Sequence, residues 1–283
     1  MVLAMAIHSR SLVLLAVLLA SMSLLSSCAG FRTPDQKILR EFEDAGIPVT
    51  IGFEQAAGYR VRVLRSADES VPQVLFIHGA PGSIDDSRTY FEIEELTNRA
   101  SLVAYDRPGY GYSDFGDVET SLEAQAAVAR DLIEPGAVIV GHSFGATIAL
   151  RMAMDYPEDL AGVIILAGVS AAEYEKIWWF NRPMEWPVFN WMLGGAWRSS
   201  NTEKLSHLEE LPLFDPLWDE IRTPVIIIHG TRDRLVPYEN APYAARRIGS
   251  DFAELITLED EDHFILWTQR DLVVERILDL LGE

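Results

Sequence analysis

The chain has 283 residues, of which 49% are hydrophobic and 23% are charged, a composition that fits one globular domain with a sizeable core. It carries 43 acidic and 23 basic residues, so its formal net charge is −20. A field of this sign repels phosphate backbones and argues against nucleic acid as a partner.

The first residues have the pattern of an export signal. Residues 1–10 carry one arginine and no acid, residues 12–25 are almost wholly apolar, and Leu25-Ser26-Ser27-Cys28 follows. This pattern resembles a bacterial lipoprotein signal peptide, which implies that residues 1–27 are removed and that acyl chains such as palmitate are attached to Cys28. The chain would then be anchored to a membrane of the bacterial cell envelope, and Ala29 resembles the outer-membrane sorting pattern. An ordinary cleaved signal peptide and an uncleaved membrane anchor are the alternatives.

The next segments predict a tether and then the strands and helices of one domain. Residues 28–37 are expected to form the tether, and alternating apolar side chains predict an antiparallel edge pair at 49–51 and 59–64. Apolar runs predict buried strands at 74–77, 102–105, 138–140, 163–166 and 225–228, with a last strand at 254–258. Helical spacing or a following proline predicts helices over 120–133, from 144 to about 156, and over 269–281.

This alternation predicts an α/β fold, a mostly parallel sheet covered by helices on both faces. More than fifty residues separate the strands at 163–166 and 225–228, far more than an ordinary connection. We therefore expect a helical lid (cap) inserted at residues 170–222, with the core formed by residues 38–169 and 223–283.

The strongest local signal is Gly141-His142-Ser143-Phe144-Gly145, which follows an apolar strand and precedes a helix of small residues. In this context a G-x-S-x-G sequence predicts a tight turn that exposes a nucleophilic serine. Gly141 and Gly145 are needed because a side chain at either place would collide with the backbone that folds over the turn.

From about residue 47 to residue 281 the chain resembles the α/β-hydrolase fold family. The resemblance rests on residues 78–82 (His-Gly-Ala-Pro-Gly), the Asp106-to-Ser113 loop, residues 141–145, and an acid and a histidine further downstream. It implies a catalytic triad of Ser143, Asp233 and His263, in the chain order of the family. It also implies an oxyanion hole formed by the backbone N–H groups of Ala80 and Phe144.

A serine nucleophile implies an acyl-enzyme, and hence an ester, thioester, lactone or amide substrate of small to medium size. The expected activity is that of a carboxylesterase-like serine hydrolase that needs no cofactor or metal. The loop at 78–82 also resembles proline iminopeptidases, in which lid carboxylates hold the substrate amine, and Glu173, Glu175 and Glu185 could serve here. A C–C bond hydrolase and a non-catalytic binding member of the fold are further alternatives.

The predicted lid is rich in tryptophan. It contains Trp178, Trp179, Trp186, Trp191, Trp197 and Trp218. Trp178, Trp179 and Trp186 are candidates to line an apolar substrate pocket above Ser143. Two other uses are open, a core for the lid itself and contact with a lipid bilayer.

Overall fold

The computed structural model describes residues 31–66, 71–114 and 118–282. The predicted signal peptide and Cys28 lie outside these ranges. Among the residues described, none of the helices combines the length and the apolar character that crossing a bilayer requires.

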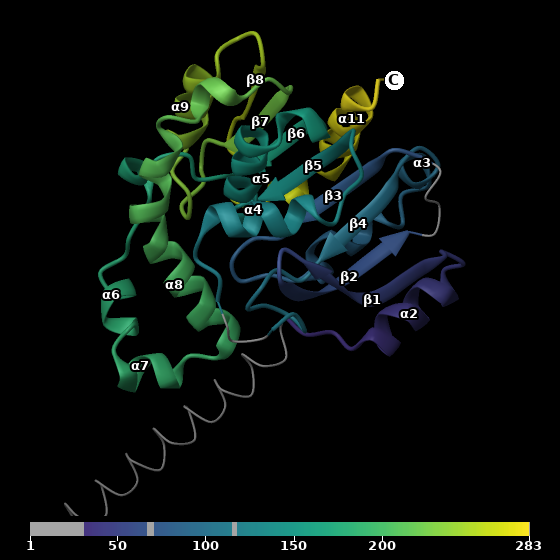
Figure 1. The fold of residues 1–283 in the computed structure, drawn as a ribbon, viewed down its shortest axis with the longest axis horizontal. Helices are drawn as coiled ribbons and strands as arrows, with labels where there is room; N and C mark the ends of the chain where they lie inside the picture. The colour runs from purple at the N-terminus through teal and green to yellow at the C-terminus, as the bar shows by residue number, and fades with distance from the viewer. Residues whose placement is uncertain (1–30, 67–70, 115–117, 283) are drawn as a thin grey trace, which may run out of the picture.

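Eight strands form one sheet in the order β1-β2-β4-β3-β5-β6-β7-β8 (Figure 1). They are β1 (Val49–Ala56), β2 (Tyr59–Ser66), β3 (Gln73–Ile77), β4 (Ser101–Tyr105), β5 (Ala137–His142), β6 (Leu160–Leu166), β7 (Val225–Gly230) and β8 (Ala253–Leu258). Strand β2 pairs antiparallel with both β1 and β4, and all other neighbouring strands pair in parallel. The sheet is therefore mostly parallel with an antiparallel edge, as the sequence predicts.

Helices cover both faces of this sheet. The α-helices are α2 (Asp35–Asp44), α3 (Glu94–Thr97), α4 (Leu122–Arg130), α5 (Phe144–Asp155), α6 (Asn181–Met184), α7 (Pro187–Met192), α8 (Gly195–Glu210), α9 (Asn240–Ile248), α10 (Ile265–Thr268) and α11 (Arg270–Leu280). Short 3-10 helices are η1 (Ile84–Tyr90), η2 (Pro157–Asp159), η3 (Ala172–Tyr174), η4 (Leu211–Phe214) and η5 (Trp218–Glu220).

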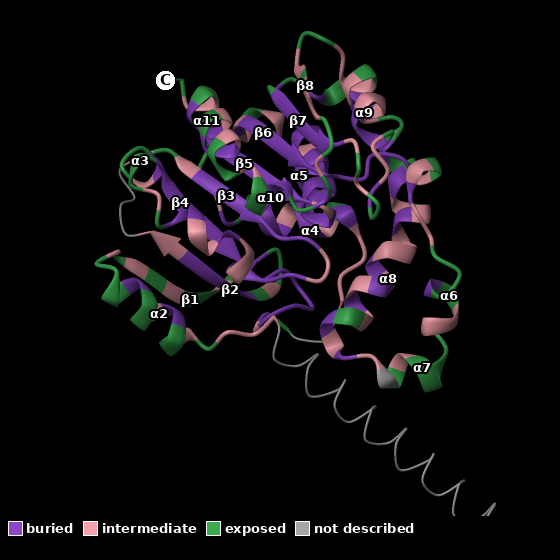
Figure 2. Cartoon of the chain, turned by 180° about the vertical axis from the view of Figure 1, so that it is seen from behind, coloured by how far each residue is buried: buried purple, intermediate pink, exposed green. Residues whose placement is uncertain are grey.

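Alternate side chains of the central strands face two separate hydrophobic clusters. In β3, Leu75 and Ile77 pack into the cluster that includes α4 and α5, whereas Val74 and Phe76 pack into the cluster that includes α2 and α11. Side chains alternate across a strand, so a strand buried on both faces must be apolar throughout. Figure 2 shows the central strands buried between the helical layers.

The N-terminal helix begins earlier than the sequence analysis places the domain boundary. Helix α2 starts at Asp35, so the last three residues of the predicted tether belong to a helix. The physical reason is that Ile38 and Phe42, one helical turn apart, are both buried in the core, and Pro34 is tolerated just before the first turn.

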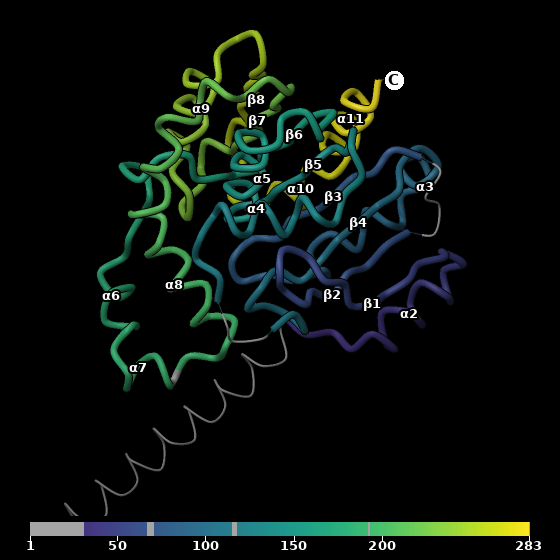
Figure 3. The backbone as a smooth tube through the Cα atoms, in the orientation of Figure 1, coloured from purple at the N-terminus to yellow at the C-terminus, as the bar shows by residue number. Residues whose placement is uncertain are grey.

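Residues 170–222 leave the sheet after β6 and return to it at β7, and we call this segment the insertion. Its path runs outward through α6 and α7 and comes back along α8 (Figure 3). The last part packs into the core, because Leu211, Phe214 and Trp218 are buried in the same cluster as α5. The outer part therefore consists of α6, α7 and α8.

Candidate active site

The candidate residues follow the carboxyl ends of adjacent parallel strands. Ser143 comes directly after β5, the loop at 78–82 follows β3, and Asp233 and His263 follow β7 and β8. From β3 the chain passes first to β4, on one side of β3, and then to β5, on the other side of β3. Parallel sheets bind ligands at such a point, where the strand order reverses, because the loops diverge and leave a crevice.

Ser143 occupies a strained turn between β5 and α5. Its backbone has φ 55° and ψ −119°, a conformation that residues with a side chain rarely adopt. A Cβ at Gly141 would lie 2.3 Å from the carbonyl oxygen of Gly145, and one at Gly145 would lie 2.1 Å from that of Ile77. Both glycines are therefore required by close backbone contacts, as the sequence analysis predicts, and Ser143 stands at the N-terminus of α5.

Asp233 and His263 are in direct contact. Nδ1 of His263 lies 2.6 Å from Oδ2 of Asp233, and both side chains are buried. Oδ1 of Asp233 accepts backbone hydrogen bonds from Leu235 and Val236. Burial by itself would raise the pKa of Asp233, but hydrogen bonds from His229 and His263 outweigh it and lower the pKa below its usual range. Asp233 therefore remains an anion that can orient the imidazole of His263.

Two further histidines support this pair. Nε2 of His229 lies 3.1 Å from the carbonyl oxygen of Val236 and 3.4 Å from Oδ2 of Asp233, so it ties down the acid loop. Nε2 of His142 lies 2.9 Å from the carbonyl oxygen of His263. Burial and the nearby charge of His263 lower the pKa of His142 to about 3, so its neutral ring donates this bond. The contact of His142 with His263 joins residues 121 positions apart, so local spacing does not predict it and only the fold brings the two together.

The loop after β3 packs against the serine turn. A Cβ at Gly79 would lie 3.2 Å from Cβ of Ser143. His78 joins this loop to the next one, because its Nδ1 lies 2.8 Å from the carbonyl oxygen of Gly79 and its Nε2 accepts the backbone N–H of Arg107 at 3.0 Å. Burial lowers the pKa of His78 well below its usual value, so it is neutral and can make both contacts. Ala80, the predicted oxyanion donor, follows directly.

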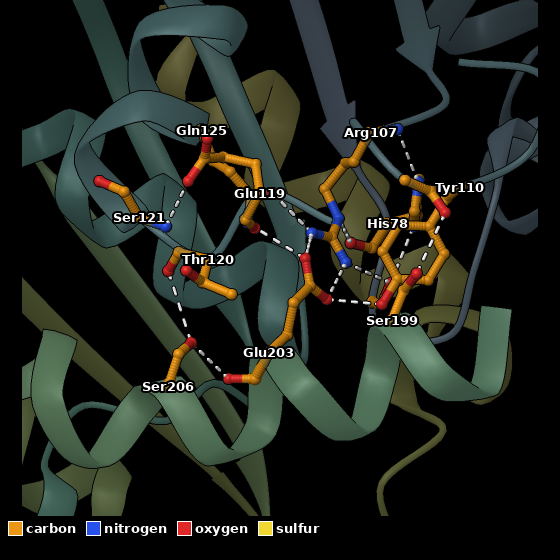
Figure 4. Close-up of polar contacts among 12 residues, drawn as sticks. His78, Arg107, Tyr110, Glu119, Thr120, Ser121, Gln125, Ser199, Glu203 and Ser206 are labelled. Atoms are coloured by element: carbon orange, nitrogen blue, oxygen red, sulfur yellow. Dashed lines mark hydrogen bonds and ion pairs between the residues drawn. The ribbon is translucent and has the colours of Figure 1, made fainter. Parts of the chain in front are cut away.

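A buried ion pair connects this loop to the insertion (Figure 4). Arg107 and Glu203 are fully buried, with Nη1 to Oε1 at 2.6 Å and Nη2 to Oε2 at 3.1 Å. Arg107 also donates to the carbonyl oxygens of His78 and Gly79, at 3.1 and 3.0 Å. Gln125 and Tyr110 donate further hydrogen bonds to Oε1 and Oε2 of Glu203, respectively. The carbonyls next to Ala80 are thus held by an arginine whose counter-ion comes from α8, a link that the sequence analysis does not predict.

Ser143 and His263 line one cavity of about 620 Å³, beneath the insertion. The cavity also includes Ala80, His142 and residues of the insertion. Its aromatic lining consists of Phe31, Trp178, Phe180, Trp197, Phe264 and Trp267. A volume of this size and an apolar lining fit a small to medium organic substrate.

The tryptophans of the insertion separate into three groups. Trp178 and Trp197 line the cavity, as predicted for Trp178. Trp179 and Trp186 do not line it and are 85% and 62% exposed, so the prediction that they contact substrate is wrong for this structure. Trp218 is only 3% exposed and belongs to the core. Trp179 lies in the turn before α6 and Trp186 directly before α7, and which of these side chains faces the cavity cannot be read from sequence spacing.

The three acids proposed to hold a substrate amine do not line the cavity. Glu175 is buried and bound to Lys204 and to Nδ1 of His207. Glu185 accepts hydrogen bonds from Asn201 and Thr202, and Glu173 is exposed. The cavity acid is instead Asp86, which the sequence analysis does not mention. Burial, with the charge of Asp85, raises the pKa of Asp86 to about 7.

Within residues 31–66, 71–114 and 118–282, no group of three or more His, Cys, Asp or Glu side chains could hold a metal ion.

Comparisons with known proteins agree with this fold. A sequence profile described as the alpha/beta hydrolase family matches residues 74–276. The dihydrolipoyllysine-residue acetyltransferase component of the acetoin cleaving system from Cupriavidus necator is 36% identical over 121 residues, 41% of this chain and 32% of that protein. The bifunctional esterase/perhydrolase DCH from Acinetobacter calcoaceticus is 28% identical over 59% of this chain and 76% of its own length.

Among solved structures, a membrane phospholipase A described as a bacterial virulence factor aligns with a TM-score of 0.65 at 17% identity. The alignment covers 96% of this chain and 98% of that one, and at this identity it shows the shared fold alone. The chain spans about a third of the length of the acetyltransferase component that it matches.

Proposed function

Because the chain belongs to the alpha/beta hydrolase family, we propose that it is a serine hydrolase that cleaves a carboxylic ester through an acyl-enzyme on Ser143. The Ser143 hydroxyl attacks the carbonyl carbon while His263 takes its proton, and Asp233 holds the imidazole in position. The N–H groups of Ala80 and Phe144 stabilise the oxyanion. His263 then protonates the leaving alcohol, and a water activated by the same imidazole releases the acid.

One observation carries the proposal. Ser143, held in its strained turn, lines the same cavity as His263, whose Nδ1 lies 2.6 Å from Asp233. A serine hydroxyl is a weak nucleophile unless a base stands beside it, and the base needs a partner that fixes its tautomer. The three side chains supply these parts in the chain order known for this fold.

The cavity favours an apolar substrate, such as an ester or a related thioester or lactone. Its aromatic side chains can bury the acyl or alcohol group. An iminopeptidase-like aminopeptidase or amidase is less well supported, because Glu173, Glu175 and Glu185 do not line the cavity. The match to an esterase over 76% of its length also supports ester chemistry.

Labelling with a fluorophosphonate tests the nucleophile, because this reagent forms a stable adduct with activated serines. We expect one adduct per chain on the wild-type protein and none on Ser143→Ala. The control is Ser200→Ala, since Ser200 also lines the cavity but is not a member of the proposed triad. Equal labelling of wild type and Ser143→Ala would contradict the proposal. Comparing a butyrate ester with a proline arylamide then separates the esterase from the peptidase.

We also propose that Cys28 carries the lipid anchor and that the chain resides in the bacterial cell envelope. The support is the sequence pattern of residues 1–28. Palmitate fed to producing cells should appear on the wild-type chain and be absent from Cys28→Ala. Equal incorporation into both chains would reject the anchor.

A further inference from the structure

The outer end of the insertion exposes three tryptophans that the cavity does not use. Trp179, Trp186 and Trp191 are 85%, 62% and 74% exposed, and Val188 beside them is also exposed. They lie on and next to the short helices α6 and α7, far from the sheet, where Figure 2 colours many residues as exposed. Large exposed apolar groups that gather in one place mark an interaction site. We propose that this surface, which we call the tryptophan face, rests on a lipid bilayer.

One member of the tryptophan face, Trp179, contacts the aromatic lining of the cavity. The ring of Trp179 meets that of Phe180 edge-on at 5.8 Å, and Phe180 stacks on Trp178 at 6.2 Å. Phe180 and Trp178 both line the cavity. A bilayer in contact with the face would therefore lie at the cavity entrance, so a membrane ester could enter without crossing water.

The charge of this region suits a bilayer surface. Residues 176–200 hold Lys176, Arg182 and Arg198 against one acid, Glu185, in a chain whose formal net charge is −20. Tryptophan and basic side chains together are typical of segments that lie at a membrane interface, where the rings enter the headgroup region and the cations attract anionic lipids. The acidic remainder of the chain is repelled by such lipids. This difference in charge orients the molecule with the tryptophan face toward the bilayer.

The start of the described chain contacts the insertion at the same cavity. The ring of Phe31 meets the ring of Trp197 edge-on at 6.2 Å, and both side chains line the cavity. Three residues of extended chain span about 11 Å at most, which limits how far Cys28 can be from Phe31. If Cys28 carries the lipid, as proposed above, the anchor enters the bilayer beside the insertion. This step rests on the proposed anchor, and it favours a bilayer over a soluble protein as the partner of the tryptophan face.

The test uses the full chain in vesicles of phosphatidylethanolamine and phosphatidylglycerol, with and without brominated acyl chains, which quench tryptophans inside the bilayer. We expect brominated vesicles to quench the wild-type emission. The quenching should fall by roughly half or more when Trp179, Trp186 and Trp191 are all replaced by Phe. In the control Trp218→Phe the quenching should persist, because Trp218 is buried in the core.

Catalysis gives a second readout. With the same three tryptophans replaced by Ala, the rate on a soluble acetate ester should be unchanged, since none of them lines the cavity. The rate on a palmitate ester dissolved in the vesicles should drop about tenfold. The matched control is the pair Phe53→Ala and Leu213→Ala, two exposed apolar residues away from the face, which should leave both rates unchanged.

The outcomes separate the proposals. A chain that floats with the vesicles but is not quenched would overturn the bilayer contact and leave the anchor standing. A chain that does not float would overturn both. Loss of self-association in the triple Ala variant, with no quenching in the wild type, would assign the face to a second copy of the chain and also overturn the bilayer contact. If the hydrolase proposal alone fails, both ester rates are absent while quenching remains.

Discussion

The carboxyl of Asp86 lies in the wall of the cavity, close to the predicted oxyanion loop. A Cβ at Gly82 would be 2.5 Å from Oδ2 of Asp86, so only glycine allows this approach. Burial and the charge of Asp85 raise the pKa of Asp86 to about 7. In the unfolded chain an aspartate has a pKa of about 3.9. The folded protein therefore binds the proton more tightly than the unfolded chain.

The raised pKa of Asp86 determines how the stability of the protein changes with pH. The folded pKa is raised, so the stabilisation that the protonated Asp86 provides is complete below about pH 4 and is lost as the pH rises to about 7. We expect Asp86→Asn to be more stable than the wild type at pH 8 and to lose this advantage at pH 4. Urea unfolding at both pH values measures it, with the exposed Glu92→Gln as control. An advantage that is equal at both pH values would show that Asp86 does not titrate in this range.

At the scale of elements, the pair Arg107–Glu203 joins α8 of the insertion to the loops after β3 and β4. Both side chains are fully buried, and Arg107 contacts the backbone next to Ala80. Removing one partner leaves the other charge buried without compensation, which typically costs about 3–5 kcal/mol. We expect Glu203→Gln to lower the free energy of unfolding by about this amount.

Denaturant unfolding measures this loss. The matched control is Glu209→Gln, an exposed acid on the same helix, which should change the free energy by less than about 0.5 kcal/mol. If the two variants have the same stability, the ion pair does not hold the insertion to the core. Oxyanion stabilisation should also weaken in Glu203→Gln, with a lower kcat at unchanged KM, because Arg107 positions the carbonyls before Ala80.

At the scale of the whole molecule, the acidic surface opposes folding. A formal net charge of −20 repels itself in the compact state, and salt screens this repulsion. Raising the ionic strength from about 0.01 M to about 0.1 M shortens the Debye length from about 30 Å to about 10 Å. We expect Tm to rise with salt over this range at pH 7, by about 2–4 °C for each kcal/mol gained in the free energy of unfolding. Differential scanning calorimetry measures the shift, and a falling Tm would mean that ion pairs outweigh the repulsion.

The sequence by itself determined the central strands and the turn at Ser143. The apolar runs at 74–77 and 225–228 predict β3 and β7 because a strand buried on both faces has no polar side. The turn at Ser143 is equally local, since Gly141 and Gly145 are required by contacts within a few residues and with the adjacent strand. The predicted domain boundary at residue 38 falls inside α2, because the burial of Ile38 and Phe42 depends on the sheet they pack against, which local spacing does not show.

The tertiary structure alone decided which distant side chains meet. The contact of His142 with the carbonyl of His263, 121 residues away, and the pair Arg107–Glu203, 96 residues apart, leave no trace in local spacing. The same holds for the tryptophans of the insertion. Their composition predicts an apolar role, but only the path of the chain around α6 and α7 divides Trp178, which lines the cavity, from Trp179 and Trp186, which are exposed outside it. Periodicity records how a residue relates to its own element, whereas a site depends on how elements pack against one another.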